Sequence, residues 1–466
     1  MTTIASERDI YDAYDTGTPT NRMKWVWILG LGGVFFEAYA GAALATGLDP
    51  LKRQLDLSTT QVSLITSSYM LVAVLLCPFA GAYSDRFGRI RVIILAKIIA
   101  CASMILALTA PNFELLLTSR VLLGVAWAMD FGVVLAYIAE FLRRQDQPKL
   151  SRWQGVWYVA TTSNLLVGLI IFQFHVGDSI WRYLMGTAAV LAAALAVLQI
   201  ALLPESPRWL ASRGRFTDAV VALQTVYKVD AVAGRDRPIG SQAPDGPGKD
   251  TGRASPKQLF QRPLLGRTVL STVSFGAQAL QYYAIGWFLP VIALQLFGES
   301  FQAATLGAIV FNAVGIIGGF SAAAIYQRFG IRPSVQVGFA ACAGILIVFG
   351  IGFDHLPLWA AIVLPAAFIL FHSALAAPGG AAFSALAYPS SLRGFGMGLS
   401  TTACNIGAFI GLFAFPYLQE SFGDGGAILV TAAVPLLGFI VVSAIRWDPE
   451  NELGDPERDN LTAVAH

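Results

Sequence analysis

The sequence predicts an all-α integral membrane protein with twelve transmembrane helices in two six-helix halves. Three observations predict this fold class. Of the 466 residues, 56% are hydrophobic and only 13% are charged, and the mean hydropathy is +0.62. Because about 25% of the residues in a soluble protein are charged, this chain has more apolar side chains than a surface in water tolerates. Its apolar residues form twelve runs of about 20 residues, the length that spans a bilayer as a helix. One long polar interruption separates the sixth run from the seventh.

The twelve runs are continuous and do not alternate with a period of two, so they predict helices rather than strands of a barrel. The expected spans are 25–47, 61–83, 92–110, 115–138, 156–176, 183–202, 267–293, 303–324, 334–353, 358–380, 394–416 and 425–446. Small residues recur one turn apart, as in Gly315 with Gly319 and Gly407 with Gly411. This spacing lets two helices approach closely within a membrane.

The basic residues predict the orientation. An even number of spans places both termini on one side of the membrane. The loops on the opposite side hold only Lys52, Arg53 and Arg182, and Arg120 lies within the fourth span. All other Lys and Arg residues, Lys97 among them, are assigned to the side of the termini. Because positive charge accumulates on the cytoplasmic side, both termini are expected to be cytoplasmic.

The polar interruption has two parts. Ser206 to Val229 has helical periodicity and predicts one or two short cytoplasmic helices. Residues 232–256 are rich in Gly, Pro and charge, and predict a flexible linker. The expected divisions are an N-terminal tail (1–24), a first half (25–202), a linker (203–266), a second half (267–446) and a C-terminal tail (447–466).

Charge and cysteine content exclude several classes of protein. The net charge of +2 is too small to indicate a nucleic-acid partner. Cys77, Cys101, Cys342 and Cys404 all lie in apolar runs without a CxxC pair or a His cluster, so neither a disulfide framework nor a metal site is expected. The first apolar run is long enough to span the bilayer rather than to be cleaved as a signal peptide. The chain has no HExxH, GxSxG, Walker or dinucleotide motif, which disfavours an enzyme and predicts no cofactor.

The loop after the second span carries the sequence GAYSDRFGRIR (81–91). It resembles the GxxxDRxGRR signature of the major facilitator superfamily, and it matches at Gly81, Asp85, Arg86, Gly88 and Arg89. Gly81 is expected to permit tight helix packing and Gly88 a tight turn. Asp85 is expected to pair with cationic groups and to latch one conformation. The loop after the eighth span repeats Arg-Phe-Gly, with Gln327 in place of the aspartate.

Further motifs extend this resemblance over most of the chain. PESPRWL (204–210) resembles the signature of sugar porters and related metabolite/proton symporters. SRVLLG (119–124) is similar to the family's RxxxG element, and YPSSLRG (388–394) resembles a loop of metabolite symporters. The resemblance implies the twelve-helix major facilitator fold, functional as a monomer, with a latch that also includes Glu140, Glu205 and Arg208.

Ionisable residues within the spans are the candidates for proton coupling, because a charge in hydrocarbon is costly. Glu37 lies in the first span, within a stretch that resembles an acidic element of proton-coupled symporters, and Ala40 replaces its second acid. Asp130 lies in the fourth span and is the first choice for proton coupling, with Glu37 as the second. Burial favours the protonated form of a carboxylate, which suits both acids to carry protons. A permanent ion pair to a structural base is the alternative for each acid. Arg120 is too far along the helix to pair directly with Asp130, about 15 Å. His372 is a further candidate, either as a proton acceptor or as a structural histidine.

An internal repeat of six helices predicts a substrate site near the midplane between the halves. Aromatic and amide side chains are the expected contacts, and ordinary helix packing is the alternative for each. The candidates are Trp127, Trp157, Tyr158, Asn164, Gln278, Gln281, Tyr282, Tyr283, Trp287, Asn312 and Asn405. Two buried acids without matching buried bases favour a neutral or cationic solute over a polyanion.

The resemblance and the buried acids together predict a secondary transporter in a bacterial inner membrane. The leading hypothesis is proton-coupled uptake of a small polar organic solute, such as a sugar-like, organic-acid or aromatic compound. The fifth span lacks the proline-glycine pattern of many drug/proton antiporters, which favours symport. The alternatives are a proton-coupled efflux antiporter of amphiphilic compounds and a transporter-like membrane sensor.

Overall fold

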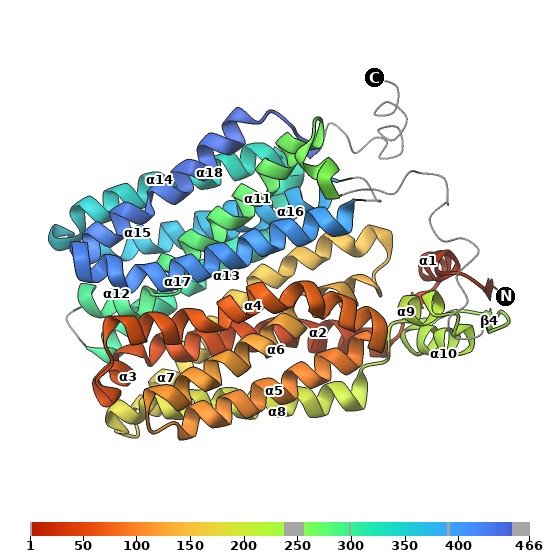
Figure 1. Cartoon of the computed structure of the whole chain (residues 1–466), viewed down its shortest axis with the longest axis horizontal. Helices are drawn as coiled ribbons and strands as arrows, with labels where there is room; N and C mark the ends of the chain where they lie inside the picture. The colour runs from red at the N-terminus through yellow and green to blue at the C-terminus, as the bar shows by residue number, and fades with distance from the viewer. Residues whose placement is uncertain (1, 237–255, 298–299, 389–391, 450–466) are drawn as a thin grey trace.

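A computed structural model describes residues 2–236, 256–297, 300–388 and 392–449. Its helices form two bundles that lie side by side, the first coloured red to yellow-green in Figure 1 and the second green to blue. The first half contains α2 (Asn21–Thr46), α3 (Leu48–Leu55), α4 (Thr59–Phe87), α5 (Arg89–Thr109), α6 (Phe113–Ala139), α7 (Trp153–Phe172) and α8 (Ile180–Leu202). Short 3-10 segments precede α7 and α8, namely η1 (Arg144–Arg152) and η2 (Gly177–Ser179).

The second half is built in the same way but contains irregular turns. It comprises η3 (Pro256–Phe260), α11 (Leu264–Gln281), η4 (Tyr282–Gly286), α12 (Leu289–Leu296), α13 (Phe301–Phe329), α14 (Ile331–Gly352), η5 (Phe353–His355), α15 (Leu358–Phe371), η6 (His372–Ala376), α16 (Ala377–Leu386), α17 (Arg393–Thr431) and α18 (Ala433–Ala444). Two of these, η4 and η6, are π-helical turns, and each interrupts a span. Such π-turns occur often at functional sites.

The predicted fold class is confirmed. Within the described residues, ten helical stretches are long and apolar enough to cross a membrane, and the bent pair of Leu264–Gly286 with Leu289–Leu296 makes an eleventh. One of the ten, Phe395–Ala444, contains 50 residues. At 1.5 Å per residue it is about 75 Å long, far more than one crossing of about 30 Å requires. Gly423 has non-helical φ and ψ within it, so this stretch makes two crossings.

The outer surface of the bundle is apolar, as a lipid-facing surface must be. Val190, Ile317 and Ile351 are 70%, 65% and 71% exposed, respectively. Such side chains would be unfavourable in water over so wide an area. The chain is therefore an integral membrane protein.

The halves share an internal repeat that the Arg-Phe-Gly motifs mark. Both α4 and α13 contain 29 residues, and each ends at a glycine that begins the next helix. Gly88 has φ of 103° and Gly330 has φ of 86°, a region that favours glycine. The two sharp turns are thus built alike, which explains why the motif recurs.

The halves contact each other mainly through α7 with α13 and α4 with α17. Glycine makes the first contact possible, since a Cβ on Gly319 would lie 2.6 Å from the backbone nitrogen of Gly155. Gly315 packs in the same way against the ring of Tyr158. At one end of the bundle, the Tyr417 hydroxyl on α17 bonds to Thr60 on α4 at 3.0 Å.

At the other end, a small extramembrane unit projects beyond the spans (Figure 1). It contains β1 (Thr2–Ile4), α1 (Glu7–Thr16), β2 (Thr18–Pro19), α9 (Pro207–Ser212), α10 (Phe216–Val226), β3 (Tyr227–Lys228) and β4 (Ala231–Ala233). We call this end of the bundle the terminus-bearing end. The sequence predicted one or two short helices in 206–229, and the structure has two, α9 and α10.

The sequence did not predict the structure of the N-terminal tail. β1 pairs in parallel with β4, and β2 pairs antiparallel with β3. Residues 232 and 233, which the sequence assigns to a flexible linker, belong to β4, so that expectation is wrong for them. Most of the remaining linker, 237–255, lies outside the described residues, as do 450–466 of the expected C-terminal tail.

Candidate functional site

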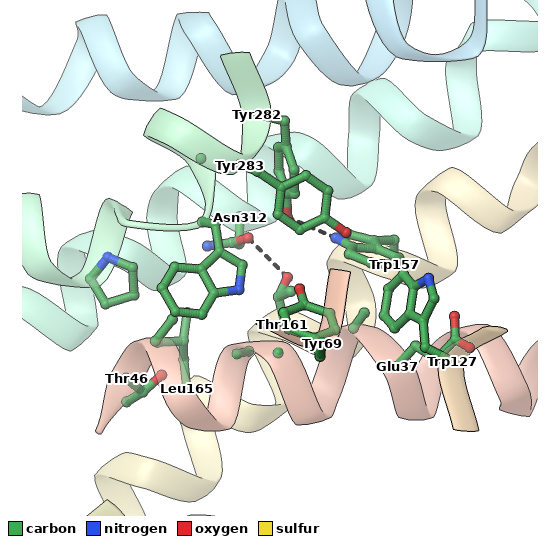
Figure 2. Close-up of a pocket in the computed structure, with 17 residues that line it drawn as sticks. Glu37, Thr46, Tyr69, Trp127, Trp157, Thr161, Leu165, Tyr282, Tyr283 and Asn312 are labelled. Atoms are coloured by element: carbon green, nitrogen blue, oxygen red, sulfur yellow. Dashed lines mark hydrogen bonds between the residues drawn. The ribbon is translucent and has the colours of Figure 1, made fainter. Parts of the chain in front are cut away.

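A cavity lies between the two halves, and α2, α4, α6 and α7 of the first half face η4, α12 and α13 of the second around it (Figure 2). Seven predicted residues line the cavity: Glu37, Trp127, Trp157, Tyr282, Tyr283, Trp287 and Asn312. Sequence reasoning missed other lining residues, among them Thr46, Tyr69, Thr161 and Leu165. The cavity measures about 20 Å³, which holds about one water molecule. The space at the centre of the site is therefore narrow in this conformation.

Glu37 is the single charged side chain among the described residues that line the cavity. It lies on α2 and is 4% exposed; no N–H or O–H group of the described residues donates to its oxygens, and the polar side chain beside it is a second carboxyl group, that of Asp130. A buried carboxylate that receives no hydrogen bond is strongly disfavoured as an anion. The geometry thus suits Glu37 to hold a proton and to release it when the cavity opens to water.

Asp130 does not line the cavity but forms an ion pair behind it. Lys97 Nζ on α5 donates to Asp130 Oδ2 on α6, and the two side chains are 1% and 2% exposed. The assignment of Lys97 to the side of the termini was wrong, because Lys97 lies eight residues inside α5. Its position within the predicted span 92–110 could have revealed this. The inference of buried acids without buried bases is corrected by the same pair.

Glu37 and the ion pair are electrostatic neighbours. The charged groups that act on the Glu37 carboxylate are Asp130 and Lys97. The α2 backbone makes room for Asp130, since a Cβ on Gly33 would lie 3.1 Å from Asp130 Oδ2. Phe36, next to Glu37, places its ring 5.0 Å from Lys97 Nζ. Two acids and one base therefore share a single buried cluster, which we call the Glu37–Asp130–Lys97 cluster.

Arg120 stands apart from this cluster. It is buried, and its guanidinium contacts Ser119 Oγ at 3.5 Å and Met185 Sδ at 3.8 Å. Among the described residues no carboxylate forms an ion pair with it. Arg120 is thus not the structural base of either acid.

Aromatic rings form most of the cavity wall. The Trp127 ring lies edge-on to those of Tyr69 and Trp157, with centroids 5.5 and 6.0 Å apart. Trp157 Nε1 on α7 donates to the Tyr282 hydroxyl on η4 at 2.7 Å, and this bond joins the two halves (Figure 2). Such rings offer apolar faces together with polar edges.

A second polar bond also crosses between the halves. The Thr161 hydroxyl on α7 donates to Asn312 Oδ1 on α13 at 2.9 Å. The Asn312 amide nitrogen donates to the carbonyl of Ala308 at 2.8 Å on its own helix. Trp287 Nε1, by contrast, has no partner and faces Gly41 of α2. A ligand would therefore find two polar groups of the wall available among the described residues, the Trp287 N–H and the Glu37 carboxyl group beside Asp130.

The predicted histidine lies behind the cavity wall. His372 begins η6, and its Nδ1 pairs with Gln281 Nε2 at 3.1 Å. Its ring stacks on that of Tyr282 at 5.1 Å. The two π-turns thus contact each other, and His372 contacts Tyr282 of the cavity wall.

The other predicted contacts do not line this cavity. Tyr158 packs edge-on to Tyr282 at 6.1 Å. Asn164 accepts from Thr46 at 3.3 Å. Gln278 and Asn405 donate to the sulfurs of Cys404 and Cys77, respectively.

The predicted latch residues gather at the terminus-bearing end. Arg89 lies 2.5 Å from Asp85 Oδ1 and donates to Glu140 Oε1 at 3.0 Å. The carbonyl of Asp85 accepts from Trp209 Nε1 at 2.7 Å and from Arg213. Asp85, Arg89, Glu140, Arg208, Trp209, Ser212 and Arg213 line one polar cavity of about 380 Å³.

Glycine has different roles at the two matched positions. Gly88 adopts positive φ, and any side chain there would strike Glu205. At Gly81, in contrast, no atom of the described residues lies within 4 Å of an added Cβ. The expectation that Gly81 permits tight packing is therefore wrong for this conformation. The remaining charged positions contact rings, Arg86 at 5.3 Å from Phe87 and Arg208 at 4.2 Å from Tyr11.

Comparison with known proteins places this architecture among transporters. The sequence model of the sugar (and other) transporter family matches residues 26–445. A putative metabolite transport protein of Bacillus subtilis is 27% identical over 90% of both chains. A D-xylose transporter of Levilactobacillus brevis is 27% identical over 87% of this chain and 88% of that protein. The major myo-inositol transporter of Bacillus subtilis is 26% identical over 86% and 85%.

Solved structures share the fold. The xylose transporter of E. coli in an inward-open conformation superposes with a TM-score of 0.72 at 16% identity, over 92% of this chain and 97% of that one. A proton:xylose symporter bound to 6-bromo-6-deoxy-D-glucose gives a TM-score of 0.68 at 17% identity, over 91% and 95%.

Proposed function

Because the chain belongs to the sugar (and other) transporter family and is a secondary transporter, we propose that it takes up a small polar organic solute together with protons. The solute crosses by alternating access of the cavity between the two halves. The protein works as a monomer, and its partners are the solute, protons and the bilayer. The observation that carries the proposal is the position of Glu37. Its buried carboxylate lines the cavity, receives no hydrogen bond from an N–H or O–H group of the described residues, and lies beside the Asp130 carboxyl group.

Glu37 is the proton carrier in this proposal, in preference to Asp130. Asp130 already forms an ion pair with Lys97, and this pair stabilises the ionised form of its carboxyl group. Protonated Glu37 can also donate a hydrogen bond to a solute oxygen. Solute binding and proton binding then favour each other at one residue, which is the requirement for symport.

The residues of the cavity wall suit the binding of a small solute that has an apolar face and hydrogen-bonding edges. Trp127, Trp157, Tyr282, Tyr283 and Trp287 provide flat surfaces, while Thr161 and Asn312 provide polar atoms. Relatives named for D-xylose and myo-inositol favour a polyol. A cavity of about 20 Å³ is too small for such a compound, so its walls must separate before the solute binds.

Efflux in exchange for protons is the second candidate, and one observation favours it. Glu37 is the single charged group on a largely aromatic wall among the described residues. Such a wall also suits an organic cation. A cation and a proton would compete for the same carboxylate, so a cationic solute would be exchanged for protons rather than carried with them.

We propose that the terminus-bearing end faces the cytoplasm of a bacterial cell across its inner membrane. The distribution of Lys and Arg supports this orientation, and the reassignment of Lys97 leaves the excess of basic residues at that end intact. The Asp85–Arg89–Glu140 ion pairs, with Glu205 and Arg208, then act as a cytoplasmic latch between conformations.

Purified protein in proteoliposomes tests the proposal. Thermal shifts with a panel of sugars, polyols, aromatic acids and amines first identify a ligand, since a ligand at 100 times its Kd stabilises by about 2.7 kcal/mol. Uptake of that ligand is then measured with the lumen made alkaline relative to the bath. Accumulation above the external concentration supports symport. Accumulation only when the lumen is acidic would establish antiport instead.

A further inference from the structure

Lys97 is a buried base, and the mechanism proposed above assigns no role to it. It is 1% exposed on α5, and its ammonium contacts Asp130 and the ring of Phe36. A buried ammonium is tolerated only with a close partner, and removal of one partner from such a pair is strongly destabilising. A membrane protein could place an apolar residue here at lower cost. A role in transport would explain why the Lys97–Asp130 pair is buried in spite of this cost.

The number of charges in the cluster suggests that explanation. Glu37 and Asp130 supply two carboxylates and Lys97 one ammonium. Two adjacent buried carboxylates cannot both ionise without a base, because their charges repel each other. With one carboxylate neutralised by Lys97, one proton is left to be gained or lost. Glu37 alone faces the cavity, so this proton is exchanged there.

We propose that Lys97 is a positioning residue for proton coupling, which keeps Asp130 ionised and so leaves Glu37 as the one group of the cluster that exchanges a proton. The inference rests on the proposed proton-coupled function and assigns within it a role to a residue that does not touch the solute.

Other charged and titratable side chains lie on the helices that surround Lys97. The helices that pack on α5 are α4, α6 and α8, and α2 contributes Phe36. Their other charged residues are Asp85 and Arg86 on α4, Glu114 and Arg120 on α6, Arg182 on α8, and Arg22 and Lys24 on α2. Their titratable phenols and thiols are Tyr39, Tyr69, Cys77, Tyr83, Tyr137 and Tyr183, and α5 itself adds Arg89, Arg91 and Cys101. Among the described residues, Lys97 forms an ion pair with Asp130 alone.

Single substitutions should disturb coupling for opposite reasons. In Asp130→Asn, Lys97 loses its anionic partner. The Lys97 ammonium should then pair with Glu37, which stays ionised and carries no proton. In Lys97→Met, Asp130 and Glu37 are two acids without a base, and together they retain an additional proton. In the double variant Lys97→Met/Asp130→Asn, both charges are absent and Glu37 again exchanges one proton.

The experiment compares these three variants with the wild-type protein and with Lys97→Arg. Counterflow, pH-driven accumulation and the dependence of transport on pH are measured in proteoliposomes with the ligand from the thermal-shift panel. We expect both single variants to keep counterflow and to lose accumulation, with pH profiles altered in different ways. The double variant is expected to recover accumulation and the wild-type pH profile, and Lys97→Arg to retain them.

Loss of accumulation with counterflow intact in the single variants, followed by recovery of accumulation in the double variant, is the decisive result. A purely structural role for the ion pair would lower accumulation and counterflow together. If the double variant folds and performs counterflow but does not accumulate, the inference is overturned. The same holds if either single variant accumulates like the wild-type protein. Glu37→Gln separates the two proposals, since accumulation by that variant contradicts the proton-coupled function at Glu37 itself. If a single variant does not fold, the double variant still decides the question.

Discussion

The carboxylate of Glu205 caps α5 by accepting the backbone N–H of Arg89 at 3.0 Å. It also accepts the N–H of Ile90 at 3.3 Å. The loop after the sixth span is thereby fixed to the turn between the second and third. Arg89 in turn forms ion pairs with Asp85 and Glu140. Residues at the ends of α4, α6 and α8 therefore meet at the N-terminus of α5. An anionic group is stabilised there by the helix dipole.

The first prediction concerns the pH dependence of this cap. Burial raises the pKa of Glu205 above its ordinary value, and the backbone hydrogen bonds oppose the rise only in part. The folded protein therefore binds this proton more tightly than the unfolded chain. Above the ordinary pKa of 4.5, the free energy of unfolding should fall as pH rises through the raised pKa. Glu205→Gln should abolish this slope, as measured by thermal unfolding at a series of pH values.

Glu205→Ala serves as the comparison, because it removes the acceptor altogether. A lost cap costs about 1 kcal/mol, so this variant should be less stable than Glu205→Gln at every pH. A wild-type stability that rises with pH relative to Glu205→Gln would contradict the assigned pKa shift.

The second prediction tests the latch. Asp85→Asn should change the balance between the two conformations while it leaves solute affinity within each conformation unchanged. Asp85 is 64% exposed in its pair with Arg89, so the substitution should alter the overall stability by less than about 1 kcal/mol. Spin-label distances between the two halves measure the balance. Asp218→Asn, which breaks an exposed pair with Arg215, is the matched control. Loss of affinity with unchanged distances would rule out the latch.

The third prediction concerns the N-terminal segment. The buried hydroxyl of Tyr14 donates to the carbonyl of Glu140 at 3.0 Å, and the Tyr14 ring packs against Tyr227. Tyr14→Phe should cost about 1 kcal/mol of local stability. Hydrogen exchange should then increase in residues 2–16. Tyr417→Phe breaks a hydroxyl bond at the opposite end and should leave this exchange unchanged. Equal protection in both variants would show that the Tyr14 bond does not hold the segment.

The fourth prediction concerns orientation. After the four native cysteines are replaced, a cysteine at Val232 on β4 should resist an impermeant thiol reagent in intact cells. A cysteine at Phe174, which is 74% exposed at the opposite end, should react. Permeabilised cells should label both positions. Efficient labelling of the Val232 site in intact cells would reverse the orientation.

The sequence predicted the spans well because apolar runs of this length have few alternatives in a membrane. It also singled out Glu37, because an acid in such a run is conspicuous, but it ranked Glu37 after Asp130 and could not show that Glu37 alone of the two lines the cavity. It could not pair Lys97 with Asp130, because the contact depends on how α5 packs on α6, thirty-three residues apart in the chain. The π-turns at Tyr282 and His372 have no sequence signal of this kind.

The polar tail was missed for a related reason. Residues 1–24 have no long apolar run, so composition indicates only that they lie outside the membrane. The two short strands in residues 2–19 form by pairing with β3 and β4, more than 200 residues away. Likewise, the amides of Gln278 and Asn405 are as polar as that of Asn312. Only packing determines that Asn312 lines the cavity.

The fifth prediction concerns the proton carrier itself. A symporter must prevent the empty but protonated carrier from returning, because that step would dissipate the gradient. A carboxylate achieves this if proton release depends on the open side and on bound solute. Glu37→Gln mimics the protonated acid permanently. We therefore expect it to retain counterflow, to lose pH-driven accumulation and to flatten the dependence of transport on pH.

His372→Gln is the control for this prediction. His372 is also buried and ionisable, but it bonds to Gln281 and lies behind the cavity wall. Glutamine can preserve a hydrogen bond to Gln281, so this variant should still accumulate the solute. Asp130→Asn should lose accumulation as Glu37→Gln does, although through the charge of Lys97 rather than through a lost proton. If Glu37→Gln still concentrates the solute under an imposed pH difference while His372→Gln does not, the histidine carries the proton and acts on the cavity through Tyr282.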